Sequence, residues 1–203
     1  MTTLVLPAGS EDADALSADL EAAGHTVIQA RRGRPGGPDG GPAWDPLSFV
    51  SARSLLIEAE ASGNGRLDAV VVFASPPPDQ TGLAETPAKD IEHSVLEWSA
   101  GHAQLVKEIL VRFCERGAGT LVLVVRQADQ GGPLSAMASG ALSGLAESLA
   151  ASRGGPWRFL GVHDESGQDG AAGHFVAKLL ADPPKDSGKV IRFTGRQGLF
   201  GQR

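Results

Sequence analysis

The sequence predicts an α/β fold in which helices flank both faces of a doubly wound parallel sheet. Short runs of β-branched and apolar residues alternate with longer segments of helical periodicity, which is typical of βαβ units. The most apolar run, 66–75, reads RLDAVVVFAS and lacks the alternation of a half-exposed strand, as expected for the buried middle of a parallel sheet. A chain of 203 residues is long enough for a three-layer core.

The elements follow one another in a regular order. A strand at 3–6 leads to a helix at about 11–23, for which Ser10 is the expected N-cap and Gly24 the stop. The segment 31–43 is too rich in glycine and proline to pack in a core and is predicted to be a flexible loop within a single domain, 1–203. Further strands are predicted at 25–30, 66–75, 119–125, 157–162 and 189–195, and further helices at about 46–61, 88–116, 133–152 and 174–180.

Apolar residues at helical spacing mark the expected core faces of the helices. The helix at 88–116 is expected to end at Gly117, and Cys114 within it is expected to be a buried, unreactive side chain. The other expected core anchors are Leu16, Leu20, Phe49, Leu55, Leu56, Ile57, Leu134, Met137, Leu142, Leu145 and Leu149.

Composition excludes several classes of function. The formal net charge is −6 and no basic face is evident, which argues against a nucleic-acid partner. No run approaches the roughly 20 apolar residues that span a bilayer, and the N-terminus lacks the basic region of a signal peptide. The single cysteine, Cys114, excludes an internal disulfide, so a cytoplasmic location is expected.

From about residue 45 onward the sequence resembles the short-chain dehydrogenases/reductases. The segment 58–75, EAEASGNGRLDAVVVFAS, is similar to that family's helix, G-x-L-D turn and fourth strand. The segments 97–125, 138–150 and 188–198 are similar to its long fourth helix with the fifth strand, to the helix of the catalytic Tyr-x-x-x-Lys, and to its last strand. The resemblance implies a Rossmann-like fold and, in an intact member, NAD(P)-dependent oxidoreductase chemistry.

The family's cofactor motif is altered at all three of its glycines. The resemblance places the glycines of T-G-x-x-x-G-x-G on Pro7, Glu11 and Ala13. Glycines there let the backbone approach a pyrophosphate on a helix N-terminus. Glu11 and Asp12 would instead bring negative charge to that place, although acids in a first helical turn also stabilise the helix dipole. No cofactor is therefore expected to bind in the family's mode.

The family's catalytic positions are altered as well. The strand-four motif Asn-Asn-Ala-Gly becomes 73–76, Phe-Ala-Ser-Pro, and the relay asparagine falls near Trp98. The serine after strand five falls near Arg126, and the tyrosine and lysine fall on Ser135 and Ser139. A serine hydroxyl without a neighbouring cation cannot replace the tyrosine as general acid and base near neutral pH. The whole chain contains no tyrosine, so no catalytic residue of the family's kind is expected.

The segment 163–173, HDESGQDGAAG, raises two further points. It follows a strand, at the edge where α/β proteins place their sites, and begins with His163, Asp164 and Glu165. These three residues are interpreted as a solvated turn, with a metal or acid–base cluster as the alternative, and no histidine pair has convincing metal-ligand spacing. The segment is too short for the helical lid that closes over substrate in the family.

Two more alternatives concern single residues. Ser75, Ser135 or Ser139 could be proposed as a nucleophile, but the sequence has no G-x-S-x-G elbow. Arg31 and Arg32 follow the second strand, where NADP-preferring relatives keep a basic residue. They are interpreted as part of a solvated loop, with a relic of that phosphate site as the alternative.

The resemblance also implies partners, because the family pairs its two long helices, here about 88–116 and 133–152, across a dimer axis. A second interface uses the C-terminal strand and the last helix. The first long helix is apolar on more than one face, which indicates two packing partners. We therefore expect a catalytically inactive subunit that pairs with an active NAD(P)-dependent short-chain dehydrogenase in a hetero-oligomer. The alternatives are a stand-alone ligand-binding or regulatory module and an enzyme of unrelated chemistry. The apolar and small residues of that helix are Ala100, Ala103, Leu105, Val106, Ile109, Leu110 and Phe113.

Overall fold

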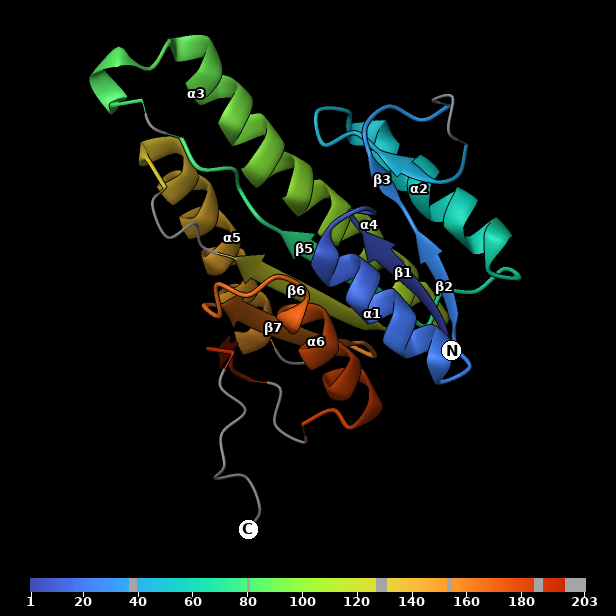
Figure 1. Cartoon of the computed structure of the whole chain (residues 1–203). Helices are drawn as coiled ribbons and strands as arrows, with labels where there is room; N and C mark the ends of the chain where they lie inside the picture. The colour runs from blue at the N-terminus through green and yellow to red at the C-terminus, as the bar shows by residue number, and fades with distance from the viewer. Residues whose placement is uncertain (37–39, 80, 127–130, 153–154, 185–187, 196–203) are drawn as a thin grey trace.

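A computed structural model of the chain describes residues 1–36, 40–79, 81–126, 131–152, 155–184 and 188–195 (Figure 1). Its main sheet has six strands, all parallel, in the order β2-β1-β5-β6-β7-β8. These are β1 (Thr2–Leu6), β2 (Thr26–Gln29), β5 (Ala69–Ala74), β6 (Thr120–Arg126), β7 (Arg158–Asp164) and β8 (Ile191–Phe193). The helices are α1 (Glu11–Ala22), α2 (Phe49–Ser62), the short 3-10 turn η1 (Leu83–Glu85), α3 (Ala88–Ser94), the π turn η2 (Val95–Ala100), α4 (Gly101–Arg116), α5 (Pro133–Ala151) and α6 (Ala171–Ala181).

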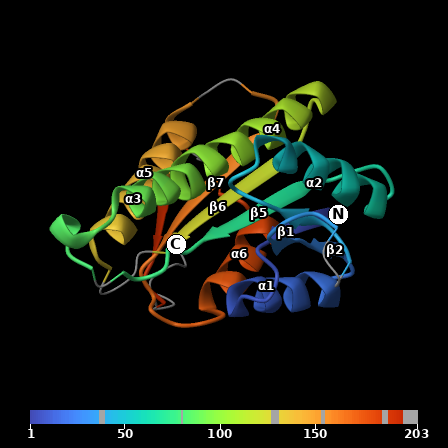
Figure 2. The same ribbon diagram turned by 90° about the horizontal axis from the view of Figure 1, so that it is seen from above.

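Helices cover both faces of this sheet, which confirms the predicted doubly wound architecture (Figure 2). Helices α1 and α6 lie on one face, where Leu16 and Val176 pack against the sheet. Helices α2, α4 and α5 lie on the other face, where Leu55, Leu105 and Leu142 join the larger core. None of the helices in the described part of the chain is long and apolar enough to cross a membrane.

The order of the strands fixes where a crevice can form. Strand β1 lies between β2 and β5, so the chain winds outward from β1 in both directions. In such sheets the carboxyl ends of the two diverging strands bound an open crevice, because the following connections leave to opposite faces. All six residues of β5 are buried, as its unbroken apolar run predicts, and Val71 of β5 pairs with Val5 of β1 and Val122 of β6.

Two predicted helix ends are confirmed. Ser10 caps α1: its Oγ accepts a hydrogen bond from the N–H of Ala13 at 3.2 Å. Gly117 ends α4 in the left-handed conformation, with φ of 73°.

The predicted helix at 88–116 is helical throughout but interrupted in its hydrogen bonding by η2, a π turn. Such turns are often found at functional sites, and this one carries Trp98. Gly101 follows it and packs against the backbone of Pro46, where a Cβ atom would lie 2.4 Å from the carbonyl oxygen.

Four side chains that were expected in the core lie at the surface. Cys114 is exposed, and Phe49, Ile57 and Met137 are 60%, 53% and 45% exposed. In α2 the buried positions are Ser51, Ala52, Leu55, Leu56 and Ala59, a single stripe at helical spacing that leaves Phe49 and Ile57 outside it.

The predicted loop 31–43 is pinned at both ends. Two short strands, β3 (Arg31–Arg32) and β4 (Ala43–Trp44), pair in parallel, and the N–H of Arg31 donates to the carbonyl of Pro42 at 3.0 Å. This pairing corrects the prediction of a flexible loop at the two ends of the segment, and residues 37–39 lie outside the described part of the chain. The pairing places Arg32 and Trp44 next to the carboxyl end of β1.

Candidate functional site

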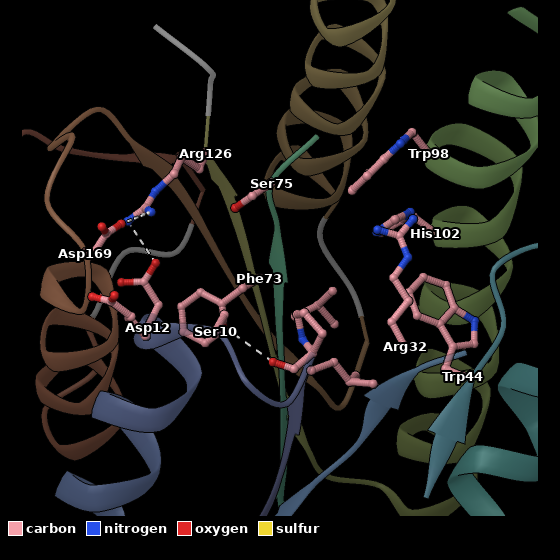
Figure 3. Close-up of a pocket in the computed structure, with 14 residues that line it drawn as sticks. Ser10, Asp12, Arg32, Trp44, Phe73, Ser75, Trp98, His102, Arg126 and Asp169 are labelled. Carbon is pink, nitrogen blue, oxygen red and sulfur yellow. Dashed lines mark hydrogen bonds and ion pairs between the residues drawn. The ribbon is translucent and has the colours of Figure 1, made fainter. Parts of the chain in front are cut away.

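A cavity of about 270 Å³ opens at the carboxyl ends of β1 and β5, in the crevice that the strand order creates (Figure 3). Leu6 and Pro7 at the end of β1, together with Val72, Phe73 and Ser75 of β5 and the turn after it, form its floor. A charged wall lies on the side of α1 and β6, and an aromatic wall on the side of η2 and α4.

The charged wall is built around Arg126, the last residue of β6. Its Nε donates to Asp164 Oδ2 at 2.7 Å, and its Nη2 lies 2.8 Å from Asp12 Oδ2. Its Nη1 donates to Asp169 Oδ1 and its Nη2 to the carbonyl of Gln168, both at 3.1 Å. One guanidinium therefore joins α1, β6, β7 and the turn that follows β7.

Burial and pairing compete in setting the charge state of this wall. Burial raises the pKa of Asp12 above its ordinary value, while the positive charge of Arg126 opposes that rise. Burial by itself would lower the pKa of Arg126, but its hydrogen bond to Asp164 and the charges of Asp12 and Asp164 outweigh that and raise it. Arg126 is therefore held as a cation whose hydrogen-bonding groups are committed to the protein.

The solvated turn predicted for His163, Asp164 and Glu165 is only partly confirmed: His163 and Asp164 belong to β7, and Glu165 after it is exposed. Asp164 is only 2% exposed, and its carboxylate accepts hydrogen bonds from the hydroxyl and the N–H of Ser166 as well as from Arg126. Glu165 forms two hydrogen bonds with Arg192 at 2.9 Å, both on exposed side chains. Within the described residues no group of histidine, cysteine and carboxylate side chains is arranged to hold a metal ion.

The aromatic wall is a stack of planar groups. The guanidinium of Arg32 lies 4.3 Å from the centre of the Trp98 ring, and its charge is paired with Glu97. The ring of His102 stacks on Trp98 with centres 5.1 Å apart, and Trp44 meets His102 edge-on at 4.9 Å. Arg32 is still exposed, as the solvated-loop interpretation expects, but its guanidinium also packs on Trp98, which that interpretation did not foresee.

His102 has the most perturbed environment at the cavity. It is 3% exposed, and burial lowers its pKa to about 4, with the backbone carbonyl of Glu97 acting in the opposite direction. Its Nδ1 lies 3.0 Å from that carbonyl. Because a carbonyl can only accept, Nδ1 carries the proton, and Nε2 is left as a bare acceptor at neutral pH.

A second cavity, of about 230 Å³, lies on the other side of Trp98, against the first turn of α5. Ser135 lines it, and the Ser135 N–H donates to Asp79 Oδ2 at 2.8 Å. Asp79 follows the run Pro76–Pro78, which lines the same cavity. Ser139, one turn further along α5, is 5% exposed, and its Oγ has no hydrogen-bond partner among the described residues.

These residues do not fit a nicotinamide dinucleotide. Pro7 and Glu11 line the cavity where the resemblance implies glycines, so a ring and a carboxylate stand where close backbone approach is needed. Three lining carboxylates, of Glu11, Asp12 and Asp169, outnumber the two guanidinium groups, which disfavours a pyrophosphate. The carboxylate of Asp12 is turned toward Arg126 and the N–H of Gly173 instead of lying free at the start of α1.

Comparison with solved structures shows which known proteins share this architecture. NADPH-dependent 3-quinuclidinone reductase from Rhodotorula rubra matches with a TM-score of 0.75 and 14% identity, over 96% of this chain and 89% of that one. A short-chain dehydrogenase from Rhodopseudomonas palustris also matches with a TM-score of 0.75 and 14% identity, over 95% and 96% of the two chains.

A short-chain dehydrogenase/reductase from Serratia marcescens matches with a TM-score of 0.71 and 16% identity, over 95% of each chain. The chain has the short-chain dehydrogenase/reductase fold. At these identities the likeness concerns the fold alone. Models of protein families give no match to the sequence, and neither do curated proteins.

Within this short-chain dehydrogenase/reductase fold, the altered family positions separate into three places. Pro7, Glu11, Trp98 and Arg126 meet at the first cavity, and Trp98 also lines the second with Ser135. Ala13 is fully buried and Ser139 nearly so, and neither lines these two cavities.

Sequence reasoning missed the two features that give the first cavity its chemistry. His102 stands four residues after Trp98, a spacing that puts both rings on one side of a helix, and this signal was available. The pairing of Arg126 with Asp12 and Asp164 joins residues far apart in sequence, and no local pattern indicates it.

Proposed function

We propose that this chain is a non-catalytic subunit that pairs with a catalytically active NAD(P)-dependent short-chain dehydrogenase and stabilises or shapes the partner's active site. One observation carries the proposal: the chain has the fold of these enzymes but no tyrosine, and the position that the resemblance gives to the catalytic tyrosine holds the buried Ser135. A cytoplasmic location is part of the proposal, since the single cysteine allows no internal disulfide.

Exposed apolar side chains on the long helices support a pairing surface. Val95 and Leu96 of η2, Val111 of α4 and Met137 of α5 are each between 42% and 48% exposed. A shallow, almost wholly apolar groove runs along α4 and is lined by Ala103, Val106, Leu110, Val111, Cys114 and Trp157, with Lys107 and Glu115 at its edges. An apolar centre with a charged rim is typical of subunit interfaces.

The test is co-expression with the short-chain dehydrogenase encoded nearest to this gene, followed by affinity capture and size-exclusion chromatography. We expect a stoichiometric complex, and we expect Val111→Asp to weaken it at least tenfold because a carboxylate would be buried in an apolar interface. Val50→Asp is the matched control: Val50 is 74% exposed on α2 and does not line the groove on α4, so this variant should assemble normally.

Two results would contradict the proposal. Turnover by the purified chain alone, with NAD(P) and a panel of alcohols, would show independent activity. Recovery of the chain only as a monomer, in the presence of every short-chain dehydrogenase encoded beside it, would show that it does not pair with such an enzyme.

A second candidate function is a stand-alone ligand-binding module that uses the cleft of the fold. The observation that favours it is the first cavity, which the protein lines with a buried imidazole and two tryptophan side chains. A stable monomer that binds a small molecule with saturable affinity would support this alternative over the subunit.

A further inference from the structure

His102 is a buried imidazole whose presence the subunit function does not explain. Its ring lines the first cavity, and its Nδ1–H is committed to the carbonyl of Glu97. Its Nε2 has no hydrogen-bond partner within the described residues. It is also not one of the unpaired polar atoms that are completely buried. A buried acceptor at a cavity wall is satisfied only by a donor that enters the cavity.

The walls beside His102 select a flat, apolar body. Trp44 and Trp98 hold the imidazole edge-on and face-on, which fixes the direction in which Nε2 points. Across from them the floor is formed by Leu6, Val72 and Phe73. A volume of about 270 Å³ lies below the roughly 300–1,000 Å³ of most ligand pockets, so the space suits one or two rings.

The charges at the cavity disfavour an anionic ligand. The guanidinium of Arg126 is already bound by three carboxylates, and that of Arg32 is paired with Glu97 and stacked on Trp98. Neither cation is therefore available to balance a phosphate or carboxylate. Glu11 adds a further negative charge at the rim of the cavity.

We propose that this cavity binds a small, flat, uncharged molecule whose O–H or N–H group donates a hydrogen bond to Nε2 of His102. The body of the ligand lies on the apolar floor between the aromatic wall and Phe73. This site shares no lining residue with the groove on α4, so it does not depend on the proposed pairing with a dehydrogenase.

Three naphthalene probes of similar shape test separately whether the ligand needs a hydrogen-bond donor and whether it must be uncharged. The probes are 2-naphthol, which is uncharged and has a donor, 2-methoxynaphthalene, which has no donor, and 2-naphthoate, which is an anion. Isothermal titration calorimetry at pH 7 is expected to show 2-naphthol binding about tenfold more tightly than 2-methoxynaphthalene, the usual worth of one hydrogen bond. We expect 2-naphthoate to bind more weakly than either.

The His102→Phe variant tests whether His102 is the acceptor, because phenylalanine keeps the stacking on Trp98 and removes Nε2. We expect its affinity for 2-naphthol to fall about tenfold, to that for 2-methoxynaphthalene, while the latter is unchanged. His25→Phe is the control and should bind as the unaltered protein does, since His25 lies in the turn before β2 and lines neither cavity.

A measurement on the unaltered protein covers the case in which His102→Phe does not fold. With 15N-labelled histidine, the Nε2 resonance of His102 should move upfield on addition of 2-naphthol and stay in place with 2-methoxynaphthalene. Equal affinity for the donor and the methyl ether, tighter binding of 2-naphthoate, no saturable binding at millimolar concentration, or an unmoved Nε2 resonance would each overturn the proposal. Val111→Asp should leave this binding intact, so failure here and failure of subunit pairing are distinguishable.

Discussion

At the scale of single residues, the two walls of the cavity keep their central side chains in opposite charge states, a cation on one wall and a neutral ring on the other. On the charged wall, Arg126 stays ionised because buried carboxylates surround it. On the aromatic wall, His102 is neutral because burial outweighs every favourable contact of its cationic form, and the positive charge of Arg32 lowers its pKa further. Each side chain is therefore fixed in one protonation state near neutral pH.

The depressed pKa of His102 predicts a loss of stability in mild acid. Its pKa falls from 6.5 to about 4 on folding, so the unfolded chain binds a proton that the folded chain excludes. Unfolding free energy should therefore fall as the pH drops from about 6.5 to about 4, by up to about 3 kcal/mol. Urea unfolding at several pH values, compared with His102→Phe, measures this contribution. Asp12, whose raised pKa acts in the opposite direction, cancels in the difference, and equal pH slopes in both proteins would contradict the assignment.

Removal of the central cation should be strongly destabilising. In Arg126→Met, the carboxylates of Asp12 and Asp164, whose side chains are 8% and 0% exposed, lose their partner in a buried place. We expect a loss of about 3–5 kcal/mol in urea unfolding at pH 7, partly regained on acidification as those carboxylates take up protons. Arg192→Met is the control, since its pair with Glu165 is exposed and worth at most about 1 kcal/mol. A loss of stability no greater than that of the control would show that the ion pairs of Arg126 with the buried carboxylates do not stabilise the fold more than an exposed pair does.

At the scale of elements, helix α5 depends on a cap that comes from another part of the chain. Gly132 precedes the helix and supplies no side chain, while Asp79 accepts the N–H of Ser135 in its first turn. Asp79→Ala should therefore cost about 1 kcal/mol in chemical unfolding, the usual worth of an N-cap. Asp79→Asn keeps an acceptor and should retain most of the stability; an equal loss in both variants would point to the charge instead of the hydrogen bond.

The start of α4 is held by a close backbone contact. Alanine is the better helix former, yet in Gly101→Ala a Cβ would lie 2.4 Å from the carbonyl oxygen of Pro46, so we expect a loss of about 1–3 kcal/mol. Gly144→Ala in α5 meets nothing within 4 Å and should gain about 0.5–1 kcal/mol. Thermal unfolding of the two variants checks this, and a gain in both would mean that α4 shifts freely away from Pro46.

How well an element was predicted follows from how local its signal is. Strand β5 and helix α1 lie within a few residues of their predicted bounds. Their signals, an unbroken apolar run and the Ser10 cap, depend only on residues next to one another in the sequence. The exposure of Cys114 was missed because apolar neighbours in sequence do not show which side of a helix faces the sheet. The Arg126 cluster was missed because it depends on the register of β6 with β7, where Arg126 stands beside Asp164.

At the scale of the whole molecule, the fold is that of the short-chain dehydrogenases/reductases, while the crevice is lined by side chains that do not fit a dinucleotide. A protein of this size that binds a ligand at 100 times its dissociation constant gains about 2.7 kcal/mol, a rise of several degrees in Tm. We expect NAD(P)H at millimolar concentration to leave the Tm of this chain unchanged and to raise the Tm of the active dehydrogenase that is proposed as its partner. A clear rise for this chain alone, by scanning calorimetry, would contradict the residue-level argument against a dinucleotide.

The single guanidinium of Arg126 has a consequence for how this protein is maintained in a cell. It joins the ends of two neighbouring strands to the start of α1 and to the turn before α6, segments that span most of the chain. A fold that binds no nucleotide gains no stability from one. Its steady-state level would then be independent of the supply of that nucleotide, so the dehydrogenase proposed as its partner would meet this chain already folded.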